Sequence, residues 1–164
     1  MKVSKKFRWE GAHRIAWHTE GCQHLHGHSY VLWVEVEGPT GDKGMLMDFK
    51  VLKKVLKPLI AAWDHATLIA RDDVRLKEAI DHLDSKFYLL PYDSTAENMC
   101  RYITDYLLQQ GAAELAAHRI HTLTVRIQET ESCFAELRTP VDVETLASHL
   151  APGSWSATPM VQAQ

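Results

Sequence analysis

The sequence predicts an α+β protein in the order ββααββ, with a four-stranded antiparallel sheet that carries two helices on one face. Two observations support this fold class. Apolar and polar residues alternate in two segments near the start of the chain and in two near its end, a period typical of half-buried strands. Between these pairs the apolar residues recur at steps of three and four, which is typical of amphipathic helices. The chain has 164 residues, enough for one domain with its own core.

The first two strands are expected at residues 3–15 and 27–37. In the first, apolar residues and a histidine share one face while charged residues share the other. In the second, the residues from Tyr30 to Val36 place every second side chain on an apolar face. A loop over residues 16–25 connects the two strands, and the Gly-Pro-Thr-Gly-Asp segment that follows the second strand ends it.

Two amphipathic helices are expected in the middle of the chain. The first covers residues 48–63, and Pro58 within it is expected to kink the helix or break it locally. The second begins at Ser94 with the capping-box pattern Ser-Thr-Ala-Glu and stops at Gly111. The charged segment between them, residues 69–93, is expected to hold only a short helix at about 74–83.

The second pair of strands is expected at residues 120–129 and 133–137. Pro140 then ends the compact part of the chain. We therefore expect one domain over residues 1–140. A C-terminal extension over residues 141–164 is expected to be partly helical and partly disordered, since its last part is small, polar and proline-containing.

The composition excludes several classes of function. Hydrophobic residues make up 46% of the chain and charged residues 24%, as in soluble globular proteins. A net charge of −3 gives no reason to expect nucleic-acid binding, and no apolar run approaches the roughly 18 residues of a membrane span. Three cysteines, an odd number, in a chain that shows no secretory signal indicate reduced thiols and a cytoplasmic protein.

The densest cluster of potential metal ligands is the sequence Gly-Cys-Gln-His-Leu-His-Gly-His-Ser-Tyr. His26 and His28 lie two residues apart at the start of a strand, so their imidazoles point to the same side. His13 lies on the apolar face of the preceding strand, and pairing of the two strands would bring all three imidazoles together. Three histidines with an open fourth position are the pattern of a catalytic zinc site. His18 and His24 are nearby, and His24 is an alternative ligand.

Cys22 is the candidate reactive thiol. It lies in a polar loop four residues before His26, and a nearby cation and imidazoles would favour its thiolate form. The alternative for any single cysteine is an inert buried residue, an interpretation that suits Cys100 and Cys133 better.

Two further sets of titratable residues are candidates for the same site. Asp64 and His65 follow the first helix, where they could orient or relay protons, or simply form a solvated helix end. Glu129 continues the apolar face of the third strand, so it should point toward a pocket. Such a carboxylate could grip a guanidine-like ligand edge with two hydrogen bonds, or reach solvent at the frayed strand end. Glu97 is explained by the capping box and is left out of the site.

Six short motifs, in register over about residues 3–138, resemble the 6-pyruvoyl-tetrahydropterin synthase superfamily. The region 69–93 is longer than in the shortest bacterial members, and the segment after Pro140 matches nothing in the family. The matching motifs are Phe7-x-x-x-x-Ala12-His13-Arg14, Cys22-x-x-x-His26-Gly27-His28-Ser29-Tyr30, Met47-Asp48-Phe49, Asp64-His65, Ser94-Thr95-Ala96-Glu97-Asn98 and Gln128-Glu129-Thr130.

The superfamily contains enzymes with different products. Members that make 6-pyruvoyl-tetrahydropterin commonly place a longer spacer between the cysteine and the His-Gly-His motif. The bacterial 6-carboxy-5,6,7,8-tetrahydropterin synthases of the queuosine pathway place three residues there, as this chain does between Cys22 and His26. The resemblance therefore implies the carboxy-forming lyase. The pyruvoyl-forming enzyme, a non-catalytic pterin- or zinc-binding paralogue and a zinc hydrolase are the alternatives.

The resemblance also implies a substrate, a cofactor and an assembly. The substrate would be 7,8-dihydroneopterin triphosphate and the cofactor Zn²⁺. The tunnelling fold of the family implies a homohexamer, built as a dimer of trimers, with active sites at subunit contacts. The implied roles are zinc binding by His13, His26 and His28, proton abstraction by Cys22, proton relay by Asp64 and His65, and binding of the 2-amino-4-oxo pterin edge by Glu129.

Overall fold

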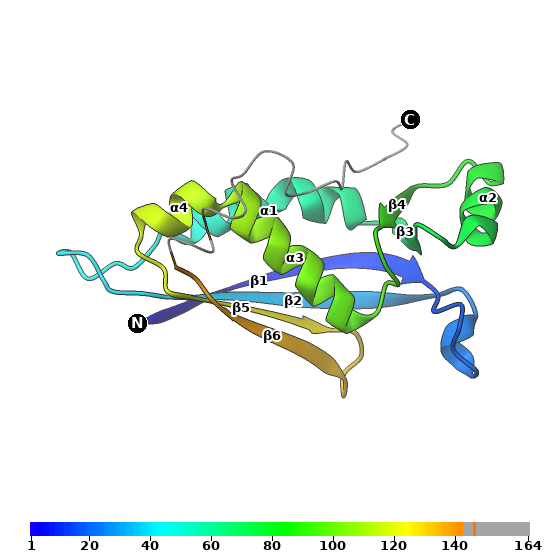
Figure 1. Cartoon of the computed structure of the whole chain (residues 1–164), viewed down its shortest axis with the longest axis horizontal. Helices are drawn as coiled ribbons and strands as arrows, with labels where there is room; N and C mark the ends of the chain where they lie inside the picture. The colour runs from blue at the N-terminus through cyan, green and yellow to red at the C-terminus, as the bar shows by residue number, and fades with distance from the viewer. Residues whose placement is uncertain (143–145, 147–164) are drawn as a thin grey trace.

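A curled six-stranded sheet with helices packed on one face forms the body of the protein (Figure 1). The computed structural model describes residues 1–142 and residue 146. The strand order in the sheet is β4-β3-β1-β2-β5-β6. The strands are β1 (Lys2–His13), β2 (His26–Glu37), β3 (Ala66–Ala70), β4 (Phe87–Leu90), β5 (Thr122–Gln128) and β6 (Phe134–Pro140). The helices are α1 (Phe49–Trp63), α2 (Val74–His82), α3 (Ala96–Gln110) and α4 (Ala112–Ala117), with one 3₁₀ turn, η1 (Gly21–Gln23).

The four strands predicted from alternation form one continuous antiparallel block. β1 pairs with β2 along its whole length, β2 pairs with β5, and β5 pairs with β6. In the β1–β2 ladder His13 lies directly opposite His26, and Gly11 lies opposite His28. This register places the three predicted ligands at one end of the central hairpin.

The predicted four-stranded, purely antiparallel sheet is wrong at its β1 edge. Two further strands extend the sheet there: β3 runs parallel to β1, and β4 runs parallel to β3, with α2 as their connection. The short helix expected at 74–83 is confirmed as α2. The strands on either side of it were missed because they have only five and four residues. All five residues of β3 are buried, so its sequence shows no alternation.

The helices begin and end close to the predicted positions, with two corrections. α1 continues through Pro58, so of the two expected effects, a kink or a local break, the break is absent. The N-cap of α3 is Thr95, whose hydroxyl accepts a hydrogen bond from the Asn98 amide, rather than Ser94 as the capping-box pattern suggested. Ser94 is instead fully buried. There are also four α-helices rather than two in the described part of the chain.

The core lies between the sheet and the helices α1 and α3 (Figure 1). Trp9 and Tyr30 stack on adjacent strands, and Trp63 from α1 meets the edge of Trp9. Tyr30 is fully buried and lies next to the rings of His13 and His28. The aromatic core therefore packs directly against the rings of His13 and His28.

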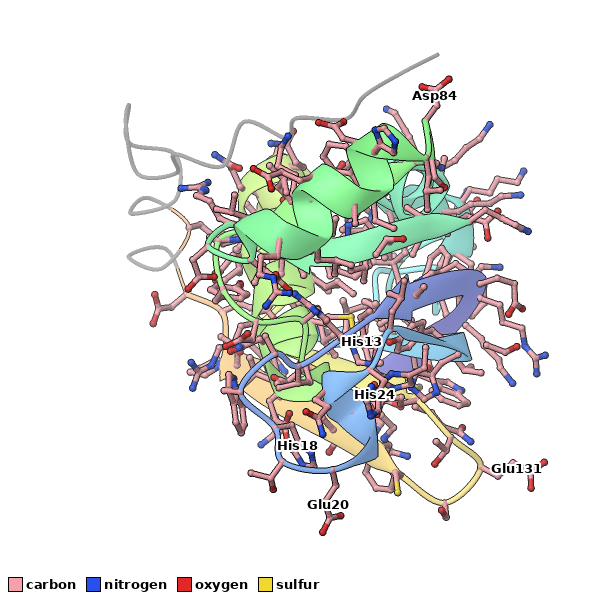
Figure 2. All side chains as sticks on the ribbon, turned by 90° about the vertical axis from the view of Figure 1, so that its right-hand side faces the viewer. His13, His18, Glu20, His24, Asp84 and Glu131 are labelled. Carbon is pink, nitrogen blue, oxygen red and sulfur yellow. The ribbon has the colours of Figure 1, made fainter. Side chains whose placement is uncertain are left out.

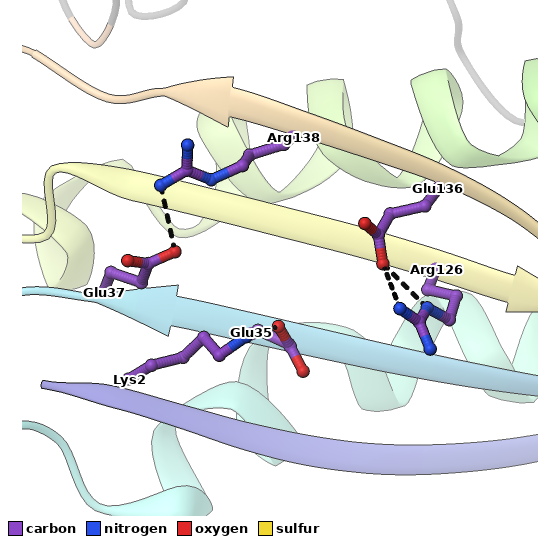
Figure 3. A network of polar contacts seen from close by, with 6 residues as sticks. All are labelled: Lys2, Glu35, Glu37, Arg126, Glu136 and Arg138. Atoms are coloured by element: carbon purple, nitrogen blue, oxygen red, sulfur yellow. Dashed lines mark hydrogen bonds and ion pairs between the residues drawn. The ribbon is translucent and has the colours of Figure 1, made fainter.

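The opposite face of the sheet carries charged side chains (Figure 3). Three ion pairs join strands across this face, at distances of 2.7 to 3.3 Å between nitrogen and oxygen; two link adjacent strands, and the third links β6 to β2 across β5. They are Lys2–Glu35, Arg126–Glu136 and Arg138–Glu37.

The C-terminal extension expected at residues 141–164 lies almost entirely outside the described residues. Val141 and Leu146 are described, and both are buried against the core. None of the described helices combines the length and the apolar character that crossing a membrane requires.

Candidate metal centre and active site

The structure brings His13, His26 and His28 together at the end of the β1–β2 hairpin. Their ring centroids lie 4.7 to 5.2 Å apart. One nitrogen from each ring lies within 4.8 Å of the other two, so the three could hold a single metal ion. In the described part of the chain this is the one such group of metal-ligating side chains.

Backbone carbonyls orient two of the three imidazoles. Nδ1 of His13 lies 2.7 Å from the carbonyl oxygen of Ser94, and Nδ1 of His26 lies 2.7 Å from that of His24. A ring nitrogen that faces a carbonyl must carry a proton, and in the neutral imidazole this leaves Nε2 with a free lone pair. Such contacts are typical of metal-binding histidines, because they fix both the tautomer and the orientation of the ring.

Two ring nitrogens of this group are buried without a partner. Nε2 of His13 and Nε2 of His28 have no hydrogen-bond partner although both are shielded from solvent. A buried polar atom without a partner costs free energy, so such atoms usually belong to a ligand site. Unpartnered nitrogens on converging imidazoles match the donor set that Zn²⁺ and similar divalent ions prefer.

Burial keeps the two inner histidines in the form that binds metals. Desolvation is the main cause that lowers the pKa of His13, opposed by its contacts with Ser94 and Glu129. Desolvation also lowers the pKa of His28. A lowered pKa means that the neutral imidazole, which is the ligating form, predominates near neutral pH.

Glu129 places a carboxylate beside the same cluster. It follows the last residue of β5, and its Oε1 lies 3.4 Å from Nε2 of His13 and 3.8 Å from Nε2 of His28. The buried hydroxyl of Tyr30 lies 3.4 Å from the same oxygen and donates to it. Burial, followed by the charge of Glu129, raises the pKa of Tyr30, so the phenol stays protonated as the donor. The inward direction predicted for Glu129 is therefore what the structure shows.

Cys22 lies in η1, within the loop between β1 and β2. Its thiol is exposed, as the polar loop sequence predicted. Its carbonyl accepts a hydrogen bond of 2.8 Å from the amide of Ile15, which fastens the loop back onto the end of β1. Within the described residues no hydrogen bond or ion pair joins Cys22 to the histidines.

The nearby histidines of this loop do not join the cluster. His24 contributes its backbone carbonyl to His26, and His18 accepts a hydrogen bond from the Glu20 amide. Figure 2 shows His18 and Glu20 on the outer part of the loop, away from His13. Neither His18 nor His24 belongs to the group that could hold a metal.

Asp64 and His65 form a pair of their own after α1. Oδ1 of Asp64 lies 3.1 Å from Nδ1 of His65 and also accepts a hydrogen bond from the amide of Glu10. That amide contact is the main cause that lowers the pKa of Asp64. His65 has a φ of 57°, in the left-handed region, and its side chain is 75% exposed. The imidazole is thus held at one nitrogen by a carboxylate and presented to solvent.

A cleft of about 450 Å³ connects the histidine cluster with the Asp64–His65 pair. His28 lines one part of it and His65 another, with the backbones of Gly11 and Gly27 between them. A side-chain carbon at position 27 would approach the Gly11 carbonyl oxygen to 3.3 Å. At position 11 a side-chain carbon would meet the indole of Trp9 at 3.3 Å, so glycine there makes room for the aromatic core.

Sequence reasoning missed the parts of the site that act through the backbone or through a core residue. The carbonyl of Ser94 carries no signal in the sequence, because any residue has one. The Tyr30 hydroxyl could have been found, since Tyr30 and the two ligands of β2 share one face of the strand.

Comparisons with known proteins show the family to which the chain belongs. The model of the family described as 6-pyruvoyl tetrahydropterin synthase matches residues 2–140. Among curated proteins, 6-carboxy-5,6,7,8-tetrahydropterin synthase of Haemophilus influenzae is 32% identical over 144 residues, covering 83% of this chain and 97% of the relative. The enzyme of the same name from Rickettsia felis is 29% identical over 140 residues, covering 84% and 99%.

Solved structures show the same fold. The 6-pyruvoyl tetrahydropterin synthase of Plasmodium falciparum superposes with a TM-score of 0.70 at 21% identity, over 86% of this chain and 98% of that one. The homologue from Caenorhabditis elegans gives a TM-score of 0.56 at 19% identity, over 85% and 95%. With a family model matched along nearly all of its described length, the chain belongs to the 6-pyruvoyl tetrahydropterin synthase family.

Proposed function

We propose that the protein is a zinc-dependent lyase that converts 7,8-dihydroneopterin triphosphate and one water molecule to 6-carboxy-5,6,7,8-tetrahydropterin, with release of acetaldehyde and triphosphate. The observation that carries this proposal is the convergence of three imidazoles, two of them with buried unpartnered Nε2 atoms, beside the carboxylate of Glu129. Curated relatives that match 83–84% of this chain over nearly their own whole length are named as the carboxy-forming synthase.

His13, His26 and His28 would hold the metal. Their neutral, oriented imidazoles suit a borderline ion such as Zn²⁺, and three nitrogen ligands leave a position for substrate. When bound, the metal supplies Lewis-acid stabilisation of negative charge on substrate oxygens.

The remaining residues would bind the substrate and move protons. Glu129 would accept hydrogen bonds from the 2-amino-4-oxo edge of the pterin, with the Tyr30 hydroxyl holding the carboxylate in place. The Cys22 thiolate would remove a proton from the side-chain carbon next to the ring. His65, oriented by Asp64 at 3.1 Å, would pass protons before triphosphate leaves and carbon–carbon cleavage releases acetaldehyde.

The proposal includes a homohexamer in which active sites form between subunits. The exposure of His65 and Cys22 in a single chain supports this, because a proton relay works only when it is close to its substrate. The sheet also ends in β4 on one side and β6 on the other, and assembly would cover such edges.

The decisive experiment is product analysis by mass spectrometry after zinc-loaded protein has been incubated with 7,8-dihydroneopterin triphosphate. The proposal expects 6-carboxy-5,6,7,8-tetrahydropterin together with acetaldehyde. A 6-pyruvoyl product without acetaldehyde would place the chain in the sister branch, whose name the solved structures carry. Unchanged substrate with bound zinc would favour a non-catalytic binding protein.

A Cys22→Ala variant separates the role of the thiol from that of the metal ligands. We expect it to lose turnover while it keeps the zinc content of the wild-type protein. Full activity in this variant would instead indicate a zinc hydrolase that needs no thiol. Loss of zinc from this variant would indicate that Cys22 is a metal ligand.

A further inference from the structure

The loop that carries Cys22 is fastened to a distant part of the chain through an exposed tryptophan. In this segment, residues 16–25 and here called the Cys22 loop, the indole N–H of Trp17 donates a hydrogen bond of 2.9 Å to Oδ2 of Asp93. The acceptor is a carboxylate, which makes the bond stronger than one between neutral groups. Trp17 is 65% exposed, so its ring does not fill the core. The part of Trp17 that the fold uses is therefore its N–H.

Apolar packing does little to hold the Cys22 loop. Its 3₁₀ turn, η1, has no buried residue, and Leu25 at the end of the loop is 47% exposed. A groove of about 580 Å³ lies between the loop and the start of α2, with Trp17 and Gln23 on its loop side. Because few apolar contacts fix such a segment, its hydrogen bonds decide where it lies.

Backbone hydrogen bonds connect Trp17 with Cys22. The amide of Ile15 donates to the Cys22 carbonyl at 2.8 Å, and the amide of His18 donates to the Ile15 carbonyl at 3.0 Å. Trp17 lies between Ile15 and His18 in the chain, so these bonds join its backbone to that of Cys22. A contact that fixes the Trp17 ring therefore also fixes the position of Cys22.

Asp93 lies in the same short segment that orients the first histidine of the cluster. Its backbone carbonyl accepts a hydrogen bond of 3.0 Å from the Asn98 side chain, which joins the segment to α3. The next residue, Ser94, holds Nδ1 of His13 through its own carbonyl. Two consecutive residues thus support two parts of the site: Asp93 holds the loop with the thiol, and Ser94 holds the histidine.

We propose that Trp17 and Asp93 are positioning residues, whose hydrogen bond keeps the Cys22 loop at a fixed place relative to the histidine cluster so that the thiol can reach the substrate. The role of the thiol rests on the proposed function, whereas the fastening of the loop does not. A displacement of about 1 Å in a reacting group can slow a reaction about a hundredfold, so one bond at the loop is enough to affect turnover.

Four variants separate the hydrogen bond from the side chains that make it. Trp17→Phe keeps an aromatic ring but loses the donor, and Asp93→Ala loses the acceptor. Asp93→Asn keeps an oxygen that can accept, and the double variant of Trp17→Phe with Asp93→Ala shows whether the two losses are one interaction. The matched control is Asp72→Ala, which removes another carboxylate from the same groove.

Each zinc-loaded protein is then compared with the wild type. Hydrogen exchange with mass spectrometry follows the peptide that contains residues 16–25. Competition with a chelator gives the zinc affinity, and thermal melting shows whether the variant is folded. Turnover of 7,8-dihydroneopterin triphosphate gives KM and the kcat per bound zinc.

Trp17→Phe and Asp93→Ala should each exchange the loop amides at least about threefold faster, because the loop opens more often. Their kcat should fall at least about tenfold while KM and zinc affinity stay unchanged, because only the thiol is displaced. Asp93→Asn should recover most of both losses, and the double variant should be no worse than the single ones. Asp72→Ala should match the wild type.

Three results would overturn the proposal. Unchanged loop exchange in both single variants would show that the bond does not fasten the loop. Faster exchange with the kcat of the wild type, or a loss of kcat that Asp93→Asn does not relieve, would reject the positioning role. Weaker zinc binding by Asp93→Ala would assign its effect to the Ser94–His13 contact instead.

These outcomes are distinct from failure of the proposed function. A wild-type protein that forms no product, with variants that show faster loop exchange, would reject the lyase and keep the fastened loop. A wild-type protein that forms the product, with variants that equal it in exchange and kcat, would keep the lyase and reject the positioning residues.

Discussion

His13 shows how one residue can be both a buried side chain and a functional one. It is 2% exposed, and a polar ring in such a place needs partners for both nitrogens. Ser94 supplies a carbonyl for Nδ1, while Nε2 has no hydrogen-bond partner among the described residues and lies 3.4 Å from Oε1 of Glu129. The metal-free protein therefore retains an unsatisfied polar atom, and a bound metal would remove this cost.

The pH dependence of the metal-free protein follows from this residue. Because burial lowers the pKa of His13, the unfolded chain takes up a proton near the ordinary value of 6.5 while the folded chain does not. The free energy of unfolding should therefore fall as the pH drops below about 6.5, by up to about 1.4 kcal/mol per pH unit for this one group. Urea unfolding between pH 7.5 and about 5.5 measures the slope.

A His13→Gln variant provides the comparison, since its amide can still donate to the Ser94 carbonyl. Its unfolding free energy should depend less on pH than that of the wild type. Equal slopes in the two proteins would show that His13 is not the group responsible. His28, whose pKa is also lowered, would then be the next candidate.

Of the three proposed ligands, His26 is the one that can be removed with least damage to the fold. It is only partly buried and lies at the start of β2. We expect His26→Ala to fold with a loss of stability of about 1 kcal/mol or less but to lose the stabilisation by zinc, which for a wild-type site at a thousandfold excess over Kd is about 4 kcal/mol. Thermal melting with and without zinc measures both effects.

The matched control is His18→Ala, which removes a histidine from the outer part of the loop (Figure 2). It should respond to zinc like the wild type. If His26→Ala were still stabilised by zinc, another side chain would have to replace His26 in the site.

At the scale of elements, an ion pair fastens α2 to the end of β1. Arg14, next to the ligand His13, donates from Nε to Asp73 at 2.7 Å and from a second nitrogen to the other carboxylate oxygen. Asp73 is also the N-cap of α2 and accepts from the Leu76 amide. Two elements far apart in the sequence are thus joined by one carboxylate whose side chain is 9% exposed.

Asp73→Asn should lower the free energy of unfolding by about 2 kcal/mol, because it leaves a partly buried guanidinium without its counter-charge. Asparagine remains a good N-cap, so the loss reports the ion pair rather than the cap. The guanidinium also lowers the pKa of Asp73, so this contribution is present above about pH 4 and is lost in acid as the carboxylate is protonated.

Glu136→Gln is the matched control for this measurement. It breaks the exposed Arg126–Glu136 pair on the open face of the sheet (Figure 3) and should cost about 0.5 kcal/mol or less. Equal losses in the two variants, measured by urea unfolding, would contradict the special role given to the bridge between β1 and α2.

The sequence was most informative where a strict period was present. Because alternate residues of a strand share a face, the convergence of His13, His26 and His28 could be predicted from parity, and the structure brings these side chains together. For Glu129 parity predicted only that the side chain points inward. Neither β3 nor β4 could be found in this way, because β3 is buried on both faces and β4 has only four residues.

The parts of the site that the sequence did not predict also lie where no strand or helix period is present. The loop that places Cys22 and the turn that places His65 follow no period, so their distances from the histidines could not be deduced. Ser94 was read as a helix cap because its side chain fits the pattern, yet Thr95 caps the helix and the Ser94 carbonyl holds His13.

At the scale of the whole molecule, the proposed assembly makes an active site that no single chain completes. This predicts complementation between inactive variants. Cys22→Ala and His65→Ala homo-oligomers should each be inactive. After the two are unfolded, mixed in equal amounts and refolded together, about a quarter of the sites should combine an intact Cys22 with an intact His65 from a neighbouring subunit.

Turnover of the mixture, compared with each variant refolded alone, checks this prediction. Light scattering on the wild type should give the mass of a hexamer of 18.7 kDa subunits. A hexamer without recovered turnover would place Cys22 and His65 of each site in the same chain. A mass of one subunit would reject the assembly.

The contact between His13 and Ser94 also has a consequence for how the protein is made. The two residues are 81 positions apart in the chain, so the ligand that begins the metal site is oriented by a segment synthesised much later. A nascent chain that has emerged only as far as β2 carries all three histidines but lacks the carbonyl that orients the first. Orientation of the first histidine at the proposed metal site therefore has to wait until Ser94 has been synthesised and the start of α3 has packed against the N-terminal hairpin.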